Sequence, residues 1–371
     1  MPSLNLLIKP ASSLCNMGCR YCFYRDVADN RNTRSYGIMT YGTMHAMLKK
    51  VFAYADLSVS FTFQGGEPTL AGEAWYREFH LAVEKYNEKK IPTSFFLQTN
   101  GYDISDGLID IFSRYKYLLG VSLDGDESIH NELRPTPSGA PTYEKINETL
   151  LRLDGAGVEY NILTVITEQV ASRGAEVYRT FRDRGFKFLQ FIPFVSDFVE
   201  ENKVDAYTLT NESYAKFLSD TFKEYRADLF SGRYVSVRQF DNFVRIAAGM
   251  PAECCGMGGR CYANLVVEAD GGVYPCDFYV LDKWKMGDIN TDSVADLFSS
   301  DAAKNFVLES LKIPKKCHTC PSFSLCKGGC RRHREDGVGA VGINRYCNAY
   351  RKFFSENAPY IIDIAKRMFK R

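Results

Sequence analysis

The stretch LNLLIKPASSLCNMGCRYCFYRD at residues 4–26 contains the pattern that decides the fold. Its apolar start at 4–9 predicts a buried strand, and Cys15, Cys19 and Cys22 follow in one loop. Three thiolates in one loop can hold three irons of a [4Fe–4S] cluster, which leaves the fourth iron open to a non-protein ligand. A zinc knuckle or chance spacing is the alternative, although zinc sites normally fill four positions with paired Cys or His ligands.

Short apolar runs alternate with longer amphipathic stretches from Leu4 to about Ile192, which is typical of a parallel α/β fold. The predicted strands are 4–9, 57–63, 93–98, 117–122, 158–165 and 187–192. Helices are predicted near 41–55, 73–89, 105–115, 142–155 and 172–184, with Asp106, Thr142 and Ser172 as candidate start signals. Six such units would form a partial (β/α)6 barrel. Its polar strand ends would converge on one site, as in other parallel α/β folds.

The chain from about residue 240 is richer in Gly, Cys and basic residues and is predicted to form a second module. A helix at about 210–230 and a strand at 233–238 lead to it. The segment LVVEADGGVYPCDF predicts a hairpin that turns at Asp270-Gly271-Gly272. We therefore expect two domains, at 1–239 and 240–371.

The composition excludes several function classes. The 371 residues include 46 basic and 45 acidic side chains, so no strong field exists to bind nucleic acid or anionic lipid. No run of 18 apolar residues predicts a membrane span, and the N-terminus lacks a secretion signal. The twelve cysteines cluster at 15–22 and 254–347. In a cytoplasmic protein, which we expect here, such clusters are more often metal ligands than disulfides.

The order Cys-x3-Cys-x-aromatic-Cys after the first strand resembles radical S-adenosylmethionine (SAM) enzymes, and the resemblance covers about residues 3–195. It implies that SAM binds the open iron and is cleaved by one electron to methionine and a 5′-deoxyadenosyl radical. The segment QGGEP at 64–68 matches the family's GGEP motif, whose glycines let the backbone approach SAM. The resemblance implies a SAM site made of Tyr21, Gly66, Glu67, Ser122, Asp124, Arg134 and Val195. For Arg134, a solvated loop arginine is the alternative.

The C-terminal cysteines match the seven-cysteine SPASM motif, which implies two auxiliary [4Fe–4S] clusters. By this resemblance, auxiliary cluster 1 would use Cys255, Cys261, Cys276 and Cys330, and auxiliary cluster 2 would use Cys317, Cys320, Cys326 and Cys347. Cys254 could replace Cys255, since the two are adjacent. The first loop then brings the total to eleven ligands for three clusters. A zinc ribbon helped by His318 and His333 is the alternative for this region.

The segments CRYCFYRD, FQGGEPTLAG, VYPCDFYVLDKW and LCKGGCRR, among others, are similar to those of anaerobic sulfatase-maturating enzymes. Such enzymes oxidise a Cys or Ser in a sulfatase motif to Cα-formylglycine without oxygen. The resemblance implies Asp277 as the proton acceptor. Tyr24 and Gln64 are candidate polar groups at the substrate, and the alternative is that either one positions the cluster loop. A structural aspartate that caps the turn after Cys276 is the alternative. The implied partners are a sulfatase polypeptide or other peptide substrate and a low-potential electron donor of flavodoxin or ferredoxin type.

Two other functions stay open at this point. The segments 131–142 and 193–206 match the family less well, and such loops select the peptide. A peptide maturase that forms thioether cross-links would keep every cluster motif and make a different product. An iron–sulfur or zinc binding scaffold without turnover is the non-enzyme alternative, against which the open-iron motif and GGEP argue.

Overall fold

The computed structural model describes residues 2–198, 204–335 and 342–369. Its contacts divide the chain into two compact units. Unit 1 comprises residues 1–123, 134–160 and 263–306, and unit 2 comprises residues 124–133, 161–262 and 307–371. These units are discontinuous in sequence, so they do not test the predicted boundary between domains 1–239 and 240–371, which stays a prediction.

Unit 1 is built on seven strands in the order β10-β9-β8-β1-β2-β3-β4. The strands are β1 (Ser3–Ile8), β2 (Ser58–Phe63), β3 (Thr93–Thr99), β4 (Leu118–Ser122), β8 (Leu265–Val267), β9 (Gly272–Tyr274) and β10 (Gly287–Asp288). Strands β1 to β4 pair in parallel, and β8 pairs in parallel with the other edge of β1. The predicted hairpin forms as the antiparallel pair β8–β9, with Gly271 at φ +100° in its turn.

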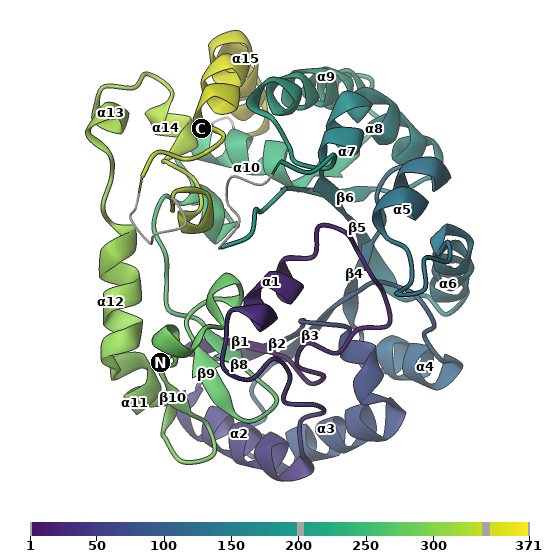
Figure 1. Ribbon diagram of the computed structural model, residues 1–371, viewed down its shortest axis with the longest axis vertical. Helices are drawn as coiled ribbons and strands as arrows, with labels where there is room; N and C mark the ends of the chain where they lie inside the picture. The colour runs from purple at the N-terminus through teal and green to yellow at the C-terminus, as the bar shows by residue number, and fades with distance from the viewer. Residues whose placement is uncertain (1, 199–203, 336–341, 370–371) are drawn as a thin grey trace. The chain divides into compact units, whose positions relative to one another are not determined.

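Helices of unit 1 follow its strands and bury apolar faces against them. They are α1 (Phe23–Asp29), α2 (Tyr41–Tyr54), α3 (Glu73–Tyr86), α4 (Asp106–Arg114), α6 (Tyr143–Gly155) and α11 (Val294–Ser299), with 3-10 turns η1 (Pro68–Ala71), η3 (Asp277–Tyr279) and η4 (Asp282–Trp284). Helices α2, α3 and α4 lie along the outer side of β1 to β4 (Figure 1). Phe61 and Phe63 of β2 are fully buried and meet Phe79 of α3 ring to ring. Helix α12 (Asp301–Ser310) is divided between the units.

Unit 2 contains β6 (Phe188–Pro193), which pairs in parallel with β5 (Glu159–Ile166) and β7 (Ser236–Val237). Its helices are α5 (Glu127–Leu133), α7 (Glu168–Ser172), α8 (Gly174–Asp183), α9 (Asn211–Phe230), α10 (Arg238–Ala247), α13 (Lys315–His318), α14 (Phe323–Cys326) and α15 (Cys347–Met368), with η2 (Cys255–Met257) and η5 (Arg331–His333). Helix α9 packs against α8 and α15. Strand β5 begins in unit 1 and continues in unit 2.

All six predicted strands of the α/β region are present, each within a residue or so of its predicted bounds. Two of the three helix start signals are corrected. Ser105, one residue before Asp106, caps α4 by accepting a hydrogen bond from the Leu108 N–H. Ser172 ends α7 instead of starting a helix, because Thr167 caps α7 and a separate α8 begins at Gly174. Thr142 does precede α6, although its hydroxyl donates to the Arg134 carbonyl.

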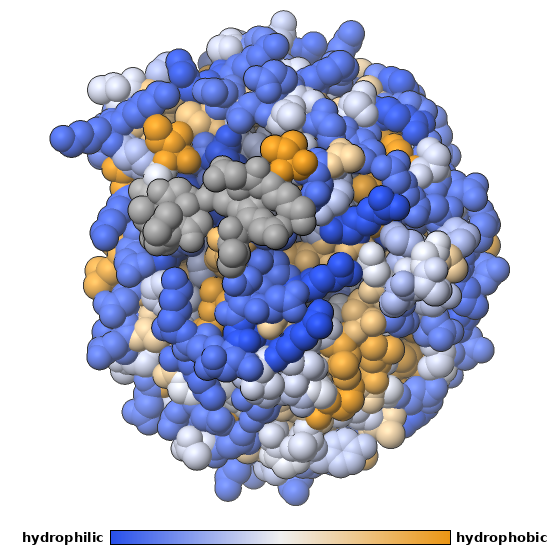
Figure 2. Space-filling model, in the orientation of Figure 1, coloured by the Kyte–Doolittle hydropathy of each residue, from blue (hydrophilic) through white to orange (hydrophobic). Residues whose placement is uncertain are grey.

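Polar side chains cover most of the face seen in Figure 2, and hydrophobic residues appear there in separate patches. Within the described ranges, no helix combines the length and apolar composition needed to cross a bilayer. Of the less familiar segment 193–206, residues 199–203 lie outside the described part of the chain.

Candidate active site

The three-cysteine loop of unit 1 connects β1 to α1. Cys22 directly precedes α1, and Cys15 Sγ accepts a hydrogen bond from the Met17 N–H at 3.4 Å. Burial raises the pKa of the Cys15 thiol to about 11. All three thiols line one cavity of about 180 Å³, together with Gly66 and other residues of the unit. The loop therefore presents Cys15, Cys19 and Cys22 to a common space, as the spacing predicts.

The glycine loop after β2 packs directly on the cysteine loop. Gly66 has φ +53°, and a Cβ on it would lie 2.2 Å from the Leu14 carbonyl oxygen. The Glu67 N–H donates to that same carbonyl at 2.7 Å. Since the clash would be with backbone, no side chain can be accommodated at position 66 without moving the cysteine loop. This close approach is the structural reason for the second glycine of GGEP.

The carboxylate of Glu67 is 1% exposed and is held by internal donors. Its Oε1 accepts from the Thr69 and Thr99 hydroxyls at 2.7 and 2.8 Å, and its Oε2 accepts from the Asn100 N–H at 2.7 Å. Burial raises the pKa of Glu67, and these hydrogen bonds oppose the rise. The carboxylate therefore connects the glycine loop to the end of β3, and its predicted contact with SAM stays a prediction.

Two of the other predicted SAM residues meet in unit 1. The Arg134 Nη1 donates to the Tyr21 hydroxyl at 2.5 Å, and Arg134 is only 7% exposed. This burial disagrees with the alternative of a solvated loop arginine. Ser122 ends β4 in the same unit and is buried.

Asp124 and Val195 belong to unit 2. Asp124 is fully buried, and its Oδ1 accepts a hydrogen bond from the Val165 N–H of β5 at 3.1 Å. Val195 follows β6 and is buried. Their predicted roles at SAM stay predictions.

The structure brings the three predicted catalytic residues together within unit 1. The Tyr24 hydroxyl donates to Asp277 Oδ2 at 2.5 Å, and Gln64 Nε2 donates to the same oxygen at 3.0 Å. Phe278, in the turn that begins at Asp277, packs against Phe23 of α1 with ring centroids 4.7 Å apart and ring planes tilted by 54°, which holds the turn against the helix. Burial and the negative charge of Asp277 raise the pKa of Tyr24 well above its usual value, so this hydroxyl remains a donor.

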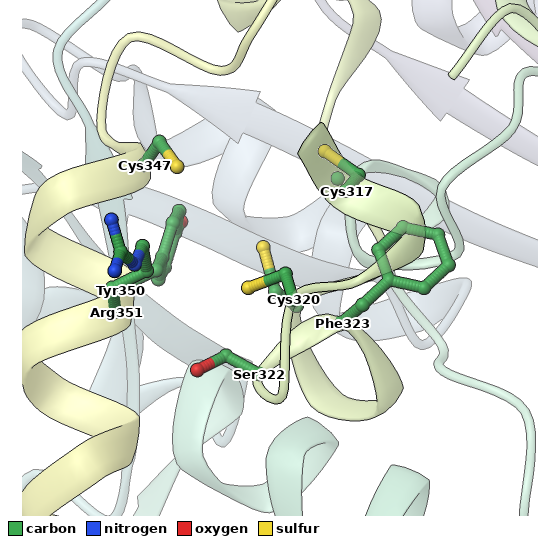
Figure 3. A pocket seen from close by; sticks show the side chains of 9 residues that line it. Cys317, Cys320, Ser322, Phe323, Cys347, Tyr350 and Arg351 are labelled. Atoms are coloured by element: carbon green, nitrogen blue, oxygen red, sulfur yellow. The ribbon is translucent and has the colours of Figure 1, made fainter. Parts of the chain in front are cut away.

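In unit 2, four cysteines line a smaller cavity of about 20 Å³. They are Cys317, Cys320, Cys326 and Cys347. Figure 3 shows the thiols of Cys317, Cys320 and Cys347 pointing toward the space between them, from α13, the turn after it and the start of α15. These are the four residues predicted for auxiliary cluster 2.

Three of the four residues predicted for auxiliary cluster 1 also lie in unit 2. Burial raises the pKa of the Cys330 thiol to about 12, and the thiols of Cys255 and Cys261 are near enough to add to the rise. Cys254 instead lies beside Asn242, whose amide donates to its Sγ at 3.8 Å. This arrangement favours Cys255 over Cys254 as the ligand. Cys276 belongs to unit 1.

The donor sets fit iron–sulfur clusters. All twelve cysteines lie in the described part of the chain, and none forms a disulfide. No three Cys, His, Asp or Glu side chains among the described residues are grouped as ligands of a single metal ion. The fit therefore rests on two observations. Thiolates are the usual ligands of iron–sulfur clusters, and three thiols line one cavity while four line another.

Sequence reasoning missed two polar residues of the site. Asn100 Nδ2 lies 3.7 Å from Cys15 Sγ and donates to Asn16 at 2.8 Å. Its position directly after β3, in the segment QTNG, was a signal that could have identified it. Lys9 Nζ lies 3.4 Å from Asp277 Oδ1, and no local pattern indicates that pairing.

Comparisons with known proteins identify the domains and the family of the chain. Residues 10–187 match the Radical SAM superfamily, and residues 255–321 match SPASM, an iron-sulfur cluster-binding domain. The chain is 41% identical to the cysteine-type anaerobic sulfatase-maturating enzyme of Clostridium perfringens (strain 13 / Type A), over 99% of this chain and 100% of that one. It is 26% identical to the serine-type anaerobic sulfatase-maturating enzyme of Klebsiella aerogenes, over 95% of this chain and 84% of that one.

Two solved structures are similar to the structure of this chain. Native anSMEcpe with bound AdoMet and Cp18Cys peptide matches with a TM-score of 0.93 and 40% identity, over 99% of this chain and 100% of that one. Streptococcus suis SuiB bound to precursor peptide SuiA matches with a TM-score of 0.63 and 17% identity, over 93% of this chain and 75% of that one, which shows a likeness of fold alone. The predicted radical SAM fold with a C-terminal SPASM domain is thus confirmed, and the chain belongs to the family of anaerobic sulfatase-maturating enzymes.

Proposed function

We propose that the protein oxidises a cysteine side chain in a sulfatase peptide to Cα-formylglycine without oxygen. The placement of Asp277 with Tyr24 and Gln64, in the same unit as the three-cysteine loop, carries this proposal. Cysteine is favoured over serine as the target because relatives named cysteine-type are 38–41% identical over the whole chain. Relatives named serine-type are 25–26% identical.

The thiols are proposed to hold three [4Fe–4S] clusters. The ligands are Cys15, Cys19 and Cys22 for the SAM cluster, Cys255, Cys261, Cys276 and Cys330 for auxiliary cluster 1, and Cys317, Cys320, Cys326 and Cys347 for auxiliary cluster 2. When bound, the clusters and SAM supply a radical that removes a hydrogen atom from carbon. Tyr21, Gly66, Glu67, Ser122, Asp124, Arg134 and Val195 are proposed to bind SAM.

Asp277 is proposed to accept the proton of the substrate thiol. Its Oδ2 already accepts two hydrogen bonds, from Tyr24 and Gln64. A carboxylate has lone pairs on both oxygens, so Oδ1 is the atom with room for a further donor. Tyr24 and Gln64 hold Oδ2 of the carboxylate, which leaves Oδ1 for the substrate thiol. A fixed base within hydrogen-bond reach is what general-base catalysis requires.

The partners are proposed to be a sulfatase polypeptide and a low-potential electron donor of flavodoxin or ferredoxin type. Lys315 and Lys316 are exposed directly before Cys317, and no described residue forms an ion pair with either. Two unpaired ammonium groups next to a cluster ligand suit an acidic protein that exchanges electrons there. A cytoplasmic location is proposed because twelve cysteines without a disulfide suit a reducing compartment.

The proposed reaction is tested by incubating the anaerobically reconstituted, reduced enzyme with SAM and a peptide that carries a sulfatase motif with Cys. Mass spectrometry after hydrazine labelling should detect an aldehyde at that residue. The same peptide with Ser should react more slowly, and one with Ala should not react. A thioether cross-link without aldehyde would contradict the proposal and favour the peptide-maturase alternative.

A further inference from the structure

Lys9, the residue directly after β1, has its charged group inside unit 1. The residue is 2% exposed, and its Nζ lies 3.4 Å from Asp277 Oδ1. The same ammonium lies 4.4 Å from the centroid of the Tyr24 ring. A buried ammonium is costly unless it is paired, and both contacts offset that cost. Among the described residues, Asp277 is the only carboxylate that pairs with Lys9.

The two oxygens of Asp277 differ in how they are held. Oδ2 accepts the short hydrogen bond from Tyr24 and a second one from Gln64. Among the described residues, Lys9 alone contacts Oδ1, at 3.4 Å, which is longer than the roughly 2.7–2.9 Å of a close charged hydrogen bond. The ammonium therefore attracts Oδ1 and fixes the direction of the carboxylate, yet it leaves that oxygen able to accept another proton.

The first glycine of the GGEP segment makes room for this lysine. A Cβ on Gly65 would lie 2.6 Å from Lys9 Cε and 2.9 Å from Lys9 Nζ. Gly65 also has φ +102°, a conformation that side chains disfavour. The Gln64-Gly65 segment thus supplies a donor to one oxygen of Asp277 and space for the cation at the other.

We propose that Lys9 is a positioning residue for Asp277, and this rests on the proposed function of Asp277 as proton acceptor. Its ammonium, held against the Tyr24 ring, keeps the carboxylate turned so that Oδ1 faces the substrate thiol. In that step the S–H bond breaks and an Oδ1–H bond forms. Without Lys9 the carboxylate remains bonded to Tyr24 and Gln64 but can rotate about them, so Oδ1 is no longer fixed.

The test compares Lys9→Met, which removes the charge, with Lys9→Arg, which keeps it, in the reconstituted full-length enzyme. Lys50→Met is the matched control, because Lys50 Nζ donates to the Ile289 carbonyl at 2.7 Å in the same unit. The readouts are kcat and KM for the peptide, the ratio of 5′-deoxyadenosine to formylglycine, and the iron content. Lys9→Met should lower kcat about 10- to 100-fold with little change in KM, and should raise the ratio, since radicals form without product.

Lys9→Arg should recover part of kcat and lower the ratio again, and Lys50→Met should behave as wild type. If Lys9→Met fails to bind iron, Lys9→Gln, which keeps an N–H donor, replaces it with the same expectation. A wild-type kcat and ratio in the uncharged variant would overturn the role of Lys9. Absence of formylglycine from the wild-type enzyme itself would instead overturn the proposed function, so the two failures are distinguishable.

Discussion

The two cavities lined by cysteines differ in how many thiols they present and in how much space they leave. In unit 1, three thiols from one loop line about 180 Å³, together with charged and polar residues such as Arg25 and Arg34. In unit 2, four thiols drawn from α13 to α15 line about 20 Å³. Three thiols with space beside them suit a cluster with an open iron, whereas four thiols with little space suit a closed one. Thiol number and cavity volume thus fit the proposed assignment of the open-iron cluster to unit 1 and of auxiliary cluster 2 to unit 2.

Removal of one cysteine should have different effects on 5′-deoxyadenosine formation at the two sites, and this difference should be larger than the effects of the other substitutions. Cys19→Ala should abolish 5′-deoxyadenosine formation, because the open-iron cluster cannot assemble. Cys317→Ala should still form 5′-deoxyadenosine, since its cavity belongs to the closed site. Each variant should lose about four irons per chain, measured by anaerobic iron analysis. Equal loss of 5′-deoxyadenosine in both variants would show that the two cysteine sites do not differ in this way.

Asp277→Asn should separate radical formation from product formation. The amide cannot accept the thiol proton, so formylglycine should fall by about 10²–10⁴-fold while 5′-deoxyadenosine continues to form. Chromatography of both products from one reaction measures this. Asp301→Asn, at an exposed position of α12, is the control and should leave both products unchanged. Full peptide oxidation by Asp277→Asn would show that the proton acceptor is another group.

Alanine at a glycine beside each cysteine site should disturb unit 1 more than unit 2, because the packing around the two glycines differs. Gly66→Ala places a Cβ 2.2 Å from a backbone oxygen at φ +53°, and should cost about 1–3 kcal/mol of local stability with loss of SAM binding. Gly256→Ala in unit 2 places its Cβ 3.3 Å from Cys330 Cβ and should have a smaller effect. Equilibrium binding of SAM and iron content report on both. The reverse order of effects would contradict the packing argument.

Each unit contains a buried histidine that should lower the free energy of unfolding in acid, and this is the smallest of the expected effects. Burial lowers the pKa of His80 and of His333 to about 3. Below the unfolded value of 6.5 the unfolded chain binds protons that the folded chain does not, so stability falls as the pH drops from 6.5 toward 3. At pH 5.5 each histidine should cost about 1.4 kcal/mol.

Anaerobic urea unfolding at pH 7.5 and 5.5, followed by tryptophan fluorescence, measures this loss. His80→Gln should reduce the difference between the two pH values. An unchanged difference would mean that His80 is protonated in the folded protein.

Local patterns predicted the strands well because each carries a continuous apolar run or alternation that the sheet buries. Asp277 was predicted by resemblance and Tyr24 and Gln64 as candidate polar groups, and the structure brings the three side chains together. The pattern could not predict that Lys9, at the end of an apolar strand, turns its charge inward to Asp277. The buried ion pair of Arg31 and Glu268, 2.6 Å long, was equally hidden, since its partners are 237 positions apart.

The parallel pairing of β8 with β1 has a consequence for the order of folding. Leu6 pairs with Leu265, so the strand that precedes Cys276 and Asp277 reaches its place only after about 260 residues of later chain have been made. At roughly 5–20 residues per second, translation delays this pairing by about 10–50 s. During that interval the cysteine loop exists without Asp277, the proposed proton acceptor. If Asp277 is the proton acceptor, as proposed, a nascent chain cannot complete the oxidation before β8 has joined the sheet.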